Sequence, residues 1–210
     1  MIRILIVDDH AIVRAGLKQI VSENPDMIVA GEASNGQEAL NFIRAEVWDV
    51  LLLDISIPGR NGLEVLKLVR QESPRLPVLI LSIYPEDQYA VRVLRAGASG
   101  YLTKESAPDL LVEAIRKVAE GGRYISPSLA EKLAIELDAS REKPRHAMLS
   151  DREFQIFCAI AMGQTNSEIA TELSLSVKTI STYRSRLMVK MDMSKNAEII
   201  HYALKNKLLD

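Results

Sequence analysis

The stretch MIRILIVDDH, residues 1–10, sets an apolar run directly before two adjacent carboxylates, Asp8 and Asp9. Near a protein surface, two like unit charges about 4 Å apart repel each other by about 4 kcal/mol. Water, a bound cation or a raised carboxyl pKa must offset this repulsion in the folded chain. Which of them does so depends on the residues that the fold brings beside the pair.

Four more apolar runs follow the first one, and amphipathic segments separate them. The five runs are IRILIV (2–7), IVAGEA (28–33), DVLLLD (49–54), PVLILS (77–82) and SGYL (99–102). The amphipathic segments lie near 11–23, 36–45, 62–72, 86–96 and 107–120. Almost continuously apolar runs are typical of strands that are covered on both faces. The alternation therefore predicts an α/β fold with a doubly wound, five-stranded parallel sheet.

The rest of the chain predicts a connector and a second, all-helical unit. Two sequences with the pattern of a capping box begin helices at Ser150 and Thr165, and Ser176 is a plausible N-cap for a third helix. A fourth helix is expected near 195–205. In the connector, one short helix is expected from Ser128 to Leu137. The predicted division is a first domain at 1–122, a linker at 123–147 and a helical domain at 148–210.

Composition argues against several classes of protein. The 210 residues contain 48% hydrophobic and 26% charged residues, which is ordinary for a globular protein. No apolar stretch approaches the roughly 20 residues of a membrane helix, and Asp8 and Asp9 come too early for a secretory signal. The single cysteine, Cys158, permits no internal disulfide. We therefore expect a cytoplasmic protein that does not act at a membrane.

Charge differs between the two halves of the chain. Residues 1–125 carry 14 Lys and Arg against 17 Asp and Glu, a net charge of −3, whereas residues 146–210 carry 8 against 7. Between Lys178 and Lys190 there are four basic residues and no acidic one. This asymmetry mildly favours a polyanionic partner, although a solvated helix face is the commoner origin of such a pattern.

Polar side chains follow four of the five predicted strands. Ligands of such sheets bind beyond the carboxyl ends of the strands, so these groups are expected to converge. Three carboxylates in one cleft form a hard, oxygen-rich site that suits Mg²⁺. A carboxylate can also act as a nucleophile toward phosphorus, and an ammonium group can neutralise the transferred phosphoryl group. The residues at the strand ends are Asp8, Asp9, Asp54, Ser82 and Lys104.

The segments LIVDDH, DISIPGRNGLE, LSIYPED and GASGYLTKES, in this order, resemble the signature segments of the two-component receiver domain, which is flavodoxin-like. The resemblance implies that Asp54 accepts a phosphoryl group from the phosphohistidine of a sensor histidine kinase, with Mg²⁺ as cofactor. It further implies the following roles. Asp8, Asp9, Asp54 and the backbone carbonyl of Ser56 hold the metal, Lys104 contacts the phosphoryl group, and Ser82 and Tyr101 form a switch pair.

Receiver domains usually have proline after this lysine, whereas the present chain has Glu105. A cis bond before a residue other than proline costs about 3–4 kcal/mol. The sequence alone therefore does not decide whether the Lys104–Glu105 peptide bond is cis or trans.

The stretch GQTNSEIATELSLSVKTISTYRSRLMVKM, residues 163–191, predicts a helix-turn-helix. On a helix from Val177, residues Ile180, Leu187 and Met191 share one side, and the opposite side is rich in hydroxyl groups and edged with cations. Arg184 falls close to the apolar side. We therefore expect it to snorkel or to form an intramolecular pair instead of contacting DNA.

This region resembles the LuxR-type DNA-binding domain, and the whole chain resembles response regulators of the NarL/FixJ class. The resemblance implies double-stranded DNA as a partner. It makes Lys178, Thr179, Tyr183 and Arg186 candidates for phosphate contacts, and Ser181, Thr182 and Ser185 candidates for contacts with base edges. Hydroxyl side chains can read several bases, so the preferred DNA sequence does not follow.

The predicted function is a phosphorylation-controlled transcription factor that forms a homodimer when phosphorylated and catalyses only the modification of its own Asp54. Two alternatives keep the fold: a constitutive DNA-binding regulator whose receiver does not switch, and a protein–protein adaptor with a helical dimerisation bundle. A phosphatase with an Asp-x-Asp nucleophile is disfavoured, because the residue two positions after Asp54 is Ser56.

Overall fold

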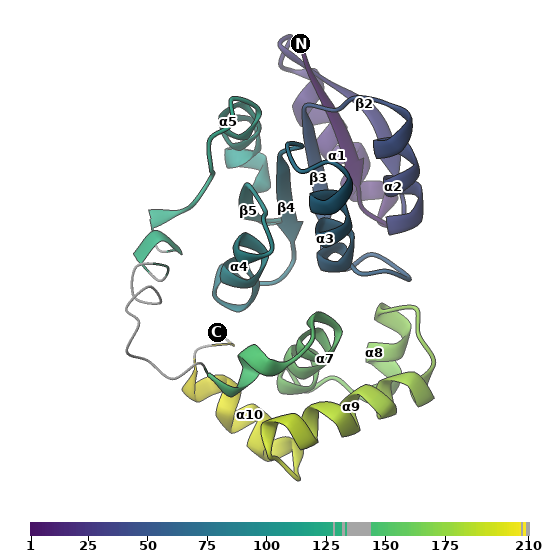
Figure 1. Ribbon diagram of the computed structural model, residues 1–210, viewed down its shortest axis with the longest axis vertical. Coiled ribbons are helices and arrows are strands. Elements are labelled where there is room, and N and C mark those ends of the chain that lie inside the picture. The colour runs from purple at the N-terminus through teal and green to yellow at the C-terminus, as the bar shows by residue number, and fades with distance from the viewer. Residues whose placement is uncertain (128, 132, 134–143, 207, 209–210) are drawn as a thin grey trace. The chain divides into compact units, whose positions relative to one another are not determined.

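The structure, a computed structural model, describes residues 1–127, 129–131, 133, 144–206 and 208. The chain divides into two compact units, Met1–Leu129 and Ala130–Asp210, each described here by itself (Figure 1). The short helix expected at 128–137 falls largely outside the described residues, although residues 129–131 are helical.

The N-terminal unit is built on a five-stranded parallel sheet, which confirms the predicted α/β class. The strand order is β2-β1-β3-β4-β5. Leu5, Leu51 and Leu53 are fully buried, as expected for strands that are covered on both faces. The strands are β1 (Ile2–Val7), β2 (Met27–Ala33), β3 (Val50–Asp54), β4 (Val78–Ser82) and β5 (Gly100–Thr103).

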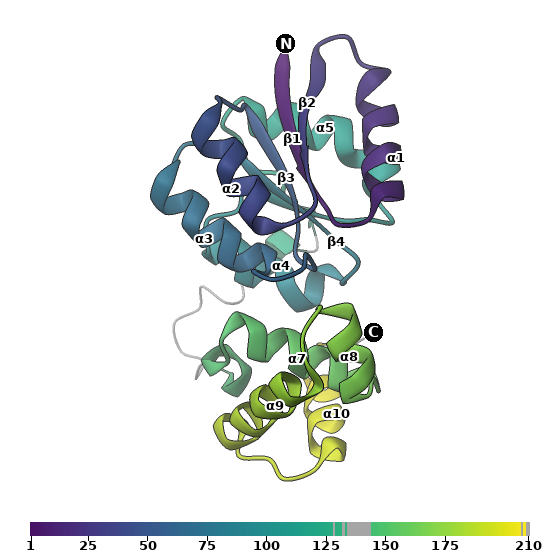
Figure 2. The same ribbon diagram turned by 90° about the vertical axis from the view of Figure 1, so that its right-hand side faces the viewer.

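Helices cover both faces of the sheet (Figure 2). On one face, Leu17 and Val21 of α1 and Leu111 and Ile115 of α5 join one core cluster with the inward side chains of the strands. On the other face α2 packs against α3, and α4 packs along β5. The helices are α1 (Ala11–Ser22), α2 (Gly36–Ala45), α3 (Gly62–Glu72), α4 (Glu86–Arg95) and α5 (Ala107–Ala119).

The end of β3 is closely covered by the start of α3. Gly62 permits this approach, because a Cβ atom at that position would lie 2.1 Å from the carbonyl oxygen of Asp54. The Gly62 amide donates to the Ile55 carbonyl, and Asn61 caps α3 by accepting from the Glu64 amide. The loop after β3 is therefore held between strand and helix, which fixes the backbone on both sides of Asp54.

The C-terminal unit is helical, as the capping sequences predict. Ser150 and Glu153 form a capping box at the start of α7, and Thr165 and Glu168 form one at the start of α8. Ser176 caps α9 by accepting from the Thr179 amide. The elements are the 3₁₀ helix η1 (Arg145–Met148) and the α-helices α7 (Asp151–Ala161), α8 (Asn166–Glu172), α9 (Val177–Met191) and α10 (Asn196–Lys205).

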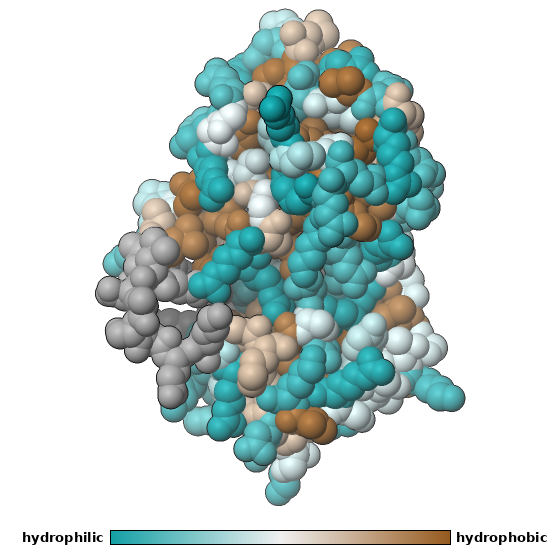
Figure 3. Space-filling model, in the orientation of Figure 1, coloured by the Kyte–Doolittle hydropathy of each residue, from teal (hydrophilic) through white to brown (hydrophobic). Residues whose placement is uncertain are grey.

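Hydrophilic side chains cover most of the face seen in Figure 3, with smaller hydrophobic areas between them. None of the helices in the described parts of the chain combines the length and the apolar character needed to span a bilayer.

Candidate phosphoacceptor site and DNA-binding helix

Asp8, Asp54 and Lys104 meet at the carboxyl edge of the sheet. Asp8 follows β1, Asp54 ends β3 and Lys104 follows β5. The Lys104 Nζ atom lies 2.7 Å from Asp8 Oδ2 and 2.7 Å from Asp54 Oδ2. Both carboxylates are almost completely buried, with 1% exposure each. Three residues that are far apart in the sequence thus form one buried cluster with two negative charges and one positive charge.

Burial controls the electrostatics of this cluster. It raises the pKa of the Asp54 carboxyl, and the neighbouring Asp8 carboxylate raises it further, while Lys104 acts in the opposite direction. For Lys104, burial alone would lower the pKa, but the carboxylates of Asp54 and Asp8 outweigh it and raise the pKa of the ammonium group. Lys104 is therefore positively charged at neutral pH and only partly balances its two partners.

The acidic cluster extends to Asp9 and His10 at the start of α1. One ligand atom from each of Asp8, Asp9, His10 and Asp54 lies within 4.8 Å of all the others. Asp9 Oδ1 is buried and accepts no hydrogen bond, although His10 Nδ1 lies 2.9 Å away. Asp8 Oδ2 accepts no well-directed hydrogen bond either. Buried carboxylate oxygens gathered this closely fit the hard donor set that Mg²⁺ takes.

Ser56 lies beside Asp54 on the loop that follows β3. Its amide donates to Asp54 Oδ1 over 3.1 Å. This bond occupies one oxygen of Asp54, while Lys104 lies against the other. The carboxyl group of Asp54 is therefore held in one orientation from two sides.

Ser82 and Tyr101 both contact the backbone of Tyr84. The Ser82 hydroxyl accepts from the Tyr84 amide over 3.1 Å, and the Tyr101 hydroxyl donates to the Tyr84 carbonyl over 2.6 Å. Both side chains are fully buried, and burial raises the pKa of the Tyr101 phenol well above its ordinary value. The structure therefore brings the predicted switch pair together through a residue that sequence reasoning did not assign to the pair.

In the C-terminal unit, α9 separates its side chains as expected. Ile180, Leu187 and Met191 are buried, whereas the residues predicted to contact bases, Ser181, Thr182 and Ser185, are exposed. Each of these three hydroxyls donates to the carbonyl four residues before it. Among the residues predicted to contact phosphate, Lys178 and Arg186 are exposed, Thr179 and Tyr183 are half-buried, and the Thr179 hydroxyl is hydrogen-bonded to that of Ser176. Arg184 donates to Asn196 over 2.7 Å, which is the intramolecular pairing expected for it.

Family comparison accounts for both units. Residues 4–116 match the family described as response regulator receiver domain, and residues 147–203 match the family described as bacterial regulatory proteins, luxR family. The chain belongs to the response regulators with a LuxR-type DNA-binding domain.

Curated relatives match this response regulator over almost their whole length. The response regulator UvrY of Escherichia coli O6:H1 is 38% identical over 209 residues, which cover 99% of this chain and 96% of UvrY. The oxygen regulatory protein NreC of Staphylococcus carnosus is 37% identical over 215 residues, 99% of each chain. Among solved structures, RcsB from Salmonella enterica serovar Typhimurium, bound to promoter rprA in the presence of the phosphomimetic BeF3-, has a TM-score of 0.65 at 25% identity and covers 96% of this chain and 98% of its own.

The peptide bond before Glu105, which stands where receiver domains usually have proline, is not cis in this response regulator. The described residues contain no cis peptide bond, so the Lys104–Glu105 bond is trans. The Lys104 amide donates to the Ser82 carbonyl over 2.7 Å. This bond ties the segment after β5 to the end of β4 and helps to place the Lys104 side chain.

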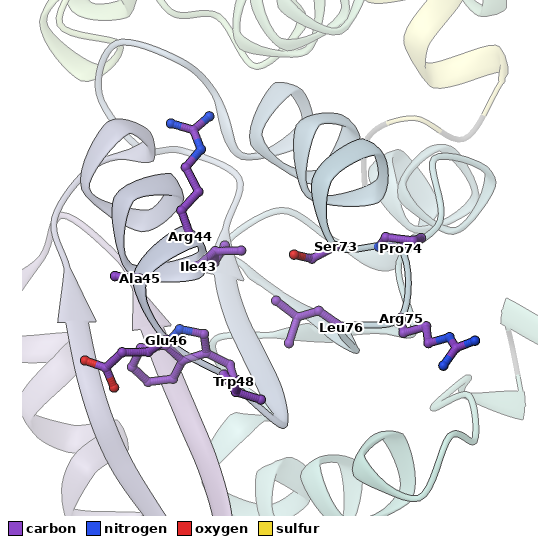
Figure 4. Close-up of a pocket in the computed structure, with 10 residues that line it drawn as sticks. Ile43, Arg44, Ala45, Glu46, Trp48, Ser73, Pro74, Arg75 and Leu76 are labelled. Carbon is purple, nitrogen blue, oxygen red and sulfur yellow. The ribbon is translucent and has the colours of Figure 1, made fainter.

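A cavity of about 560 Å³ lies at the opposite edge of the receiver sheet. Figure 4 shows it between the end of α2 and the segment that follows α3, with Trp48 and Leu76 among its side chains. These two residues precede β3 and β4, whereas Asp54 and Ser82 end the same strands. The cavity is therefore separate from the acidic cluster, and the Trp48 indole is held in place by a hydrogen bond to the Phe42 carbonyl.

Sequence reasoning placed Tyr84 near the site but missed its backbone contacts with Ser82 and Tyr101, and it missed His10 altogether. Tyr84 acts through its backbone, and the residue types in a sequence do not predict which backbone atoms a side chain will contact. His10 directly follows the two carboxylates in the chain, so its position was visible in the sequence. Only the conformation at the start of α1 shows that its ring faces them.

Proposed function

We propose that this response regulator accepts a phosphoryl group on Asp54 from the phosphohistidine of a sensor histidine kinase, and that this modification controls dimerisation and DNA binding. One observation carries the proposal: Asp54 is buried at a strand end, with one oxygen against the Lys104 ammonium and the other held by the Ser56 amide. Groups that fix a nucleophile and neutralise charge on the transferred group are the requirements of phosphoryl transfer.

In the proposed reaction, an Asp54 carboxylate oxygen attacks phosphorus and forms an O–P bond. The P–N bond to the kinase histidine breaks, and the leaving imidazole recovers its electron pair and a proton. Lys104 stays beside the modified carboxyl group and pairs with a phosphoryl oxygen. Asp8, Asp9, Asp54 and the Ser56 carbonyl would hold Mg²⁺, which supplies charge neutralisation at the transferred group. The chain thus acts only on itself.

Ser82 and Tyr101 would change conformation when Asp54 is phosphorylated and so transmit the effect to the surface of the receiver domain. Phosphorylation of Asp54 would add a charged phosphoryl oxygen that can accept a hydrogen bond from the Ser82 hydroxyl. Unmodified Asp54 offers no charged acceptor at that position. Because Ser82 and Tyr101 both bond to Tyr84, a movement of Ser82 changes the contacts of Tyr84 and of Tyr101 together. The bistable element is then the segment from Ser82 into α4.

DNA recognition is assigned to α9. Lys178, Thr179, Tyr183 and Arg186 would contact phosphates, and Ser181, Thr182 and Ser185 would face base edges. The buried side of the helix supports this assignment, since it leaves the hydroxyl-rich side exposed. The proposed working division is a receiver at 1–122, a linker at 123–147 and a DNA-binding domain at 148–210.

The acceptor assignment is tested by treating the full chain with acetyl phosphate and Mg²⁺ and by measuring its intact mass. The unmodified chain should gain one phosphoryl group, and Asp54→Asn should gain none. Asp109→Asn serves as the matched control, because it removes an exposed carboxylate from the first turn of α5 and should leave phosphorylation unchanged. Equal modification of the Asp54→Asn chain would assign the acceptor to another residue.

A further inference from the structure

His10 directs its imidazole toward the carboxylates of the phosphoacceptor site. Its Nδ1 atom lies 2.9 Å from Asp9 Oδ1 and 3.3 Å from Asp8 Oδ1. His10 is also the N-cap residue of α1, yet its side chain makes no capping hydrogen bond. The ring is therefore not used to complete the helix. Among the described residues, its ion-pair contacts are with these two carboxylates.

We propose that His10 is a ligand of the divalent cation at this site, so that the site binds first-row transition cations that favour imidazole, such as Ni²⁺, as well as Mg²⁺. The proposal rests on the metal site of the proposed function and adds a nitrogen donor to it. Imidazole is a good ligand for transition cations such as Ni²⁺ and Zn²⁺, whereas sites made only of carboxylate, carbonyl and water oxygens suit Mg²⁺ and Mn²⁺. Binding through Nδ1 leaves the proton on Nε2, and the side chain is 61% exposed, so water can accept from it.

The spacing of the ligand atoms supports a shared cation. The donor atoms of Asp8, Asp9, His10 and Asp54 lie within 4.8 Å of one another. Opposite ligands of an octahedral cation lie about 4.2 Å apart, so a shift of a few tenths of an ångström brings the set into range. The Asp8 side chain is more than nine-tenths buried, and its Oδ2 atom accepts no well-directed hydrogen bond. A divalent cation would add positive charge beside this oxygen and beside the buried Oδ1 of Asp9, whose present neighbours are Lys104 Nζ and His10 Nδ1.

An alternative role for His10 is a simple ion pair with Asp9. In that arrangement Nδ1 carries a proton and cannot bind a metal ion. The two roles therefore differ in whether a nitrogen atom is bonded to the cation, which magnetic resonance detects directly.

The experiment is pulsed electron paramagnetic resonance of Mn²⁺ bound to the full chain, with ¹⁵N-labelled histidine. The chain has three histidines, and His10 is the only one in the N-terminal unit, since the others are His146 and His201. The wild-type complex should show coupling between Mn²⁺ and ¹⁵N. His10→Gln should abolish the coupling, and the control His201→Gln should retain it.

Affinities give a second, independent measurement. Loss of a ligand should weaken Ni²⁺ binding at least as much as loss of an outer-shell partner does, by about tenfold or more. Mg²⁺ affinity of His10→Gln should change much less, because Mg²⁺ prefers oxygen ligands.

Three results would overturn the proposal in distinguishable ways. Mn²⁺ bound without nitrogen coupling in the wild type rejects His10 as a ligand and leaves the oxygen site intact. An equal loss of Mg²⁺ and Ni²⁺ affinity in His10→Gln rejects the selectivity. Absence of any Mn²⁺ binding that Mg²⁺ displaces rejects the metal site of the proposed function as well.

Discussion

Lys104 lies between two buried carboxylates, so its removal should show how much the stability of this cluster depends on positive charge. Breaking a buried ion pair by removing one partner typically costs about 3–5 kcal/mol. We expect Lys104→Ala to lower the free energy of unfolding by an amount in this range when EDTA is present, because Asp8 and Asp54 then lose their common partner. Mg²⁺ should restore part of the loss. Urea unfolding with and without Mg²⁺ measures both effects.

Lys18 provides the control for this experiment. It pairs with Glu32 over 2.7 Å, but half of its side chain is exposed. Exposed pairs contribute about 0–1 kcal/mol, so Lys18→Ala should change stability little and should not respond to Mg²⁺. Similar losses for Lys18→Ala and Lys104→Ala would show that burial does not set the strength of the Lys104 pair.

Asp54 should make the stability of the metal-free protein depend on pH. Its pKa is raised in the folded chain above the ordinary value of 3.8. Between the ordinary and the folded pKa, the folded state therefore binds more protons than the unfolded state, and stability falls as pH rises. Asn cannot ionise. The melting temperature of Asp54→Asn minus that of the wild type, measured in EDTA, should increase as pH rises through this interval. Parallel melting temperatures across the interval would contradict the raised pKa.

At the scale of the elements, the sequence predicted most of the fold, because each strand and helix carries a local signal. Near-continuous apolar runs marked strands such as β3, and serine or threonine followed three residues later by glutamate marked the starts of α7 and α8. The strands and helices expected within residues 2–120 match the observed ones to within one or two residues at each end.

Side-chain contacts between elements were less accessible to sequence reasoning. That Asp8 and Asp54 lie beside each other follows once β1 and β3 are known to be neighbours. That Lys104 Nζ contacts both carboxylates depends on rotamers, and so does the orientation of His10. The hydrogen bonds of Ser82 and Tyr101 to Tyr84 use main-chain atoms, which every residue has, so residue type carries no signal for them.

The two basic residues Lys178 and Arg184 of α9 allow a matched test of DNA binding. Lys178 is exposed, whereas Arg184 already donates to Asn196. Lys178→Ala should weaken binding to all DNA sequences and reduce the slope of log affinity against log salt concentration by about 0.9, the value for one phosphate contact. Arg184→Ala should leave the slope unchanged. Fluorescence anisotropy with a labelled duplex over a range of salt concentrations measures both slopes.

At the scale of the whole molecule, the functional question is whether phosphorylation of the N-terminal unit changes DNA binding by the C-terminal unit. A dimer that places two α9 helices in successive major grooves requires half-sites about 10 base pairs apart. Genomic DNA fragments recovered with the acetyl-phosphate-treated chain should therefore contain paired half-sites at this spacing. Inserting about half a turn, roughly 5 base pairs, between the half-sites places the second on the opposite face of the duplex, and affinity should then fall toward that of a single half-site.

Phosphorylation should determine whether this spacing matters. With acetyl phosphate and Mg²⁺, the wild-type chain should change from monomer to dimer in light scattering and should bind correctly spaced half-sites more tightly than the altered spacing. Asp54→Asn should remain monomeric and should bind both DNAs equally, because it cannot form the acyl phosphate. Spacing-dependent binding of equal strength with and without acetyl phosphate would instead identify a constitutive DNA-binding regulator, and absence of binding to every fragment would favour a protein–protein adaptor. The comparison therefore separates the switch from the DNA-binding function, since each can fail while the other is retained.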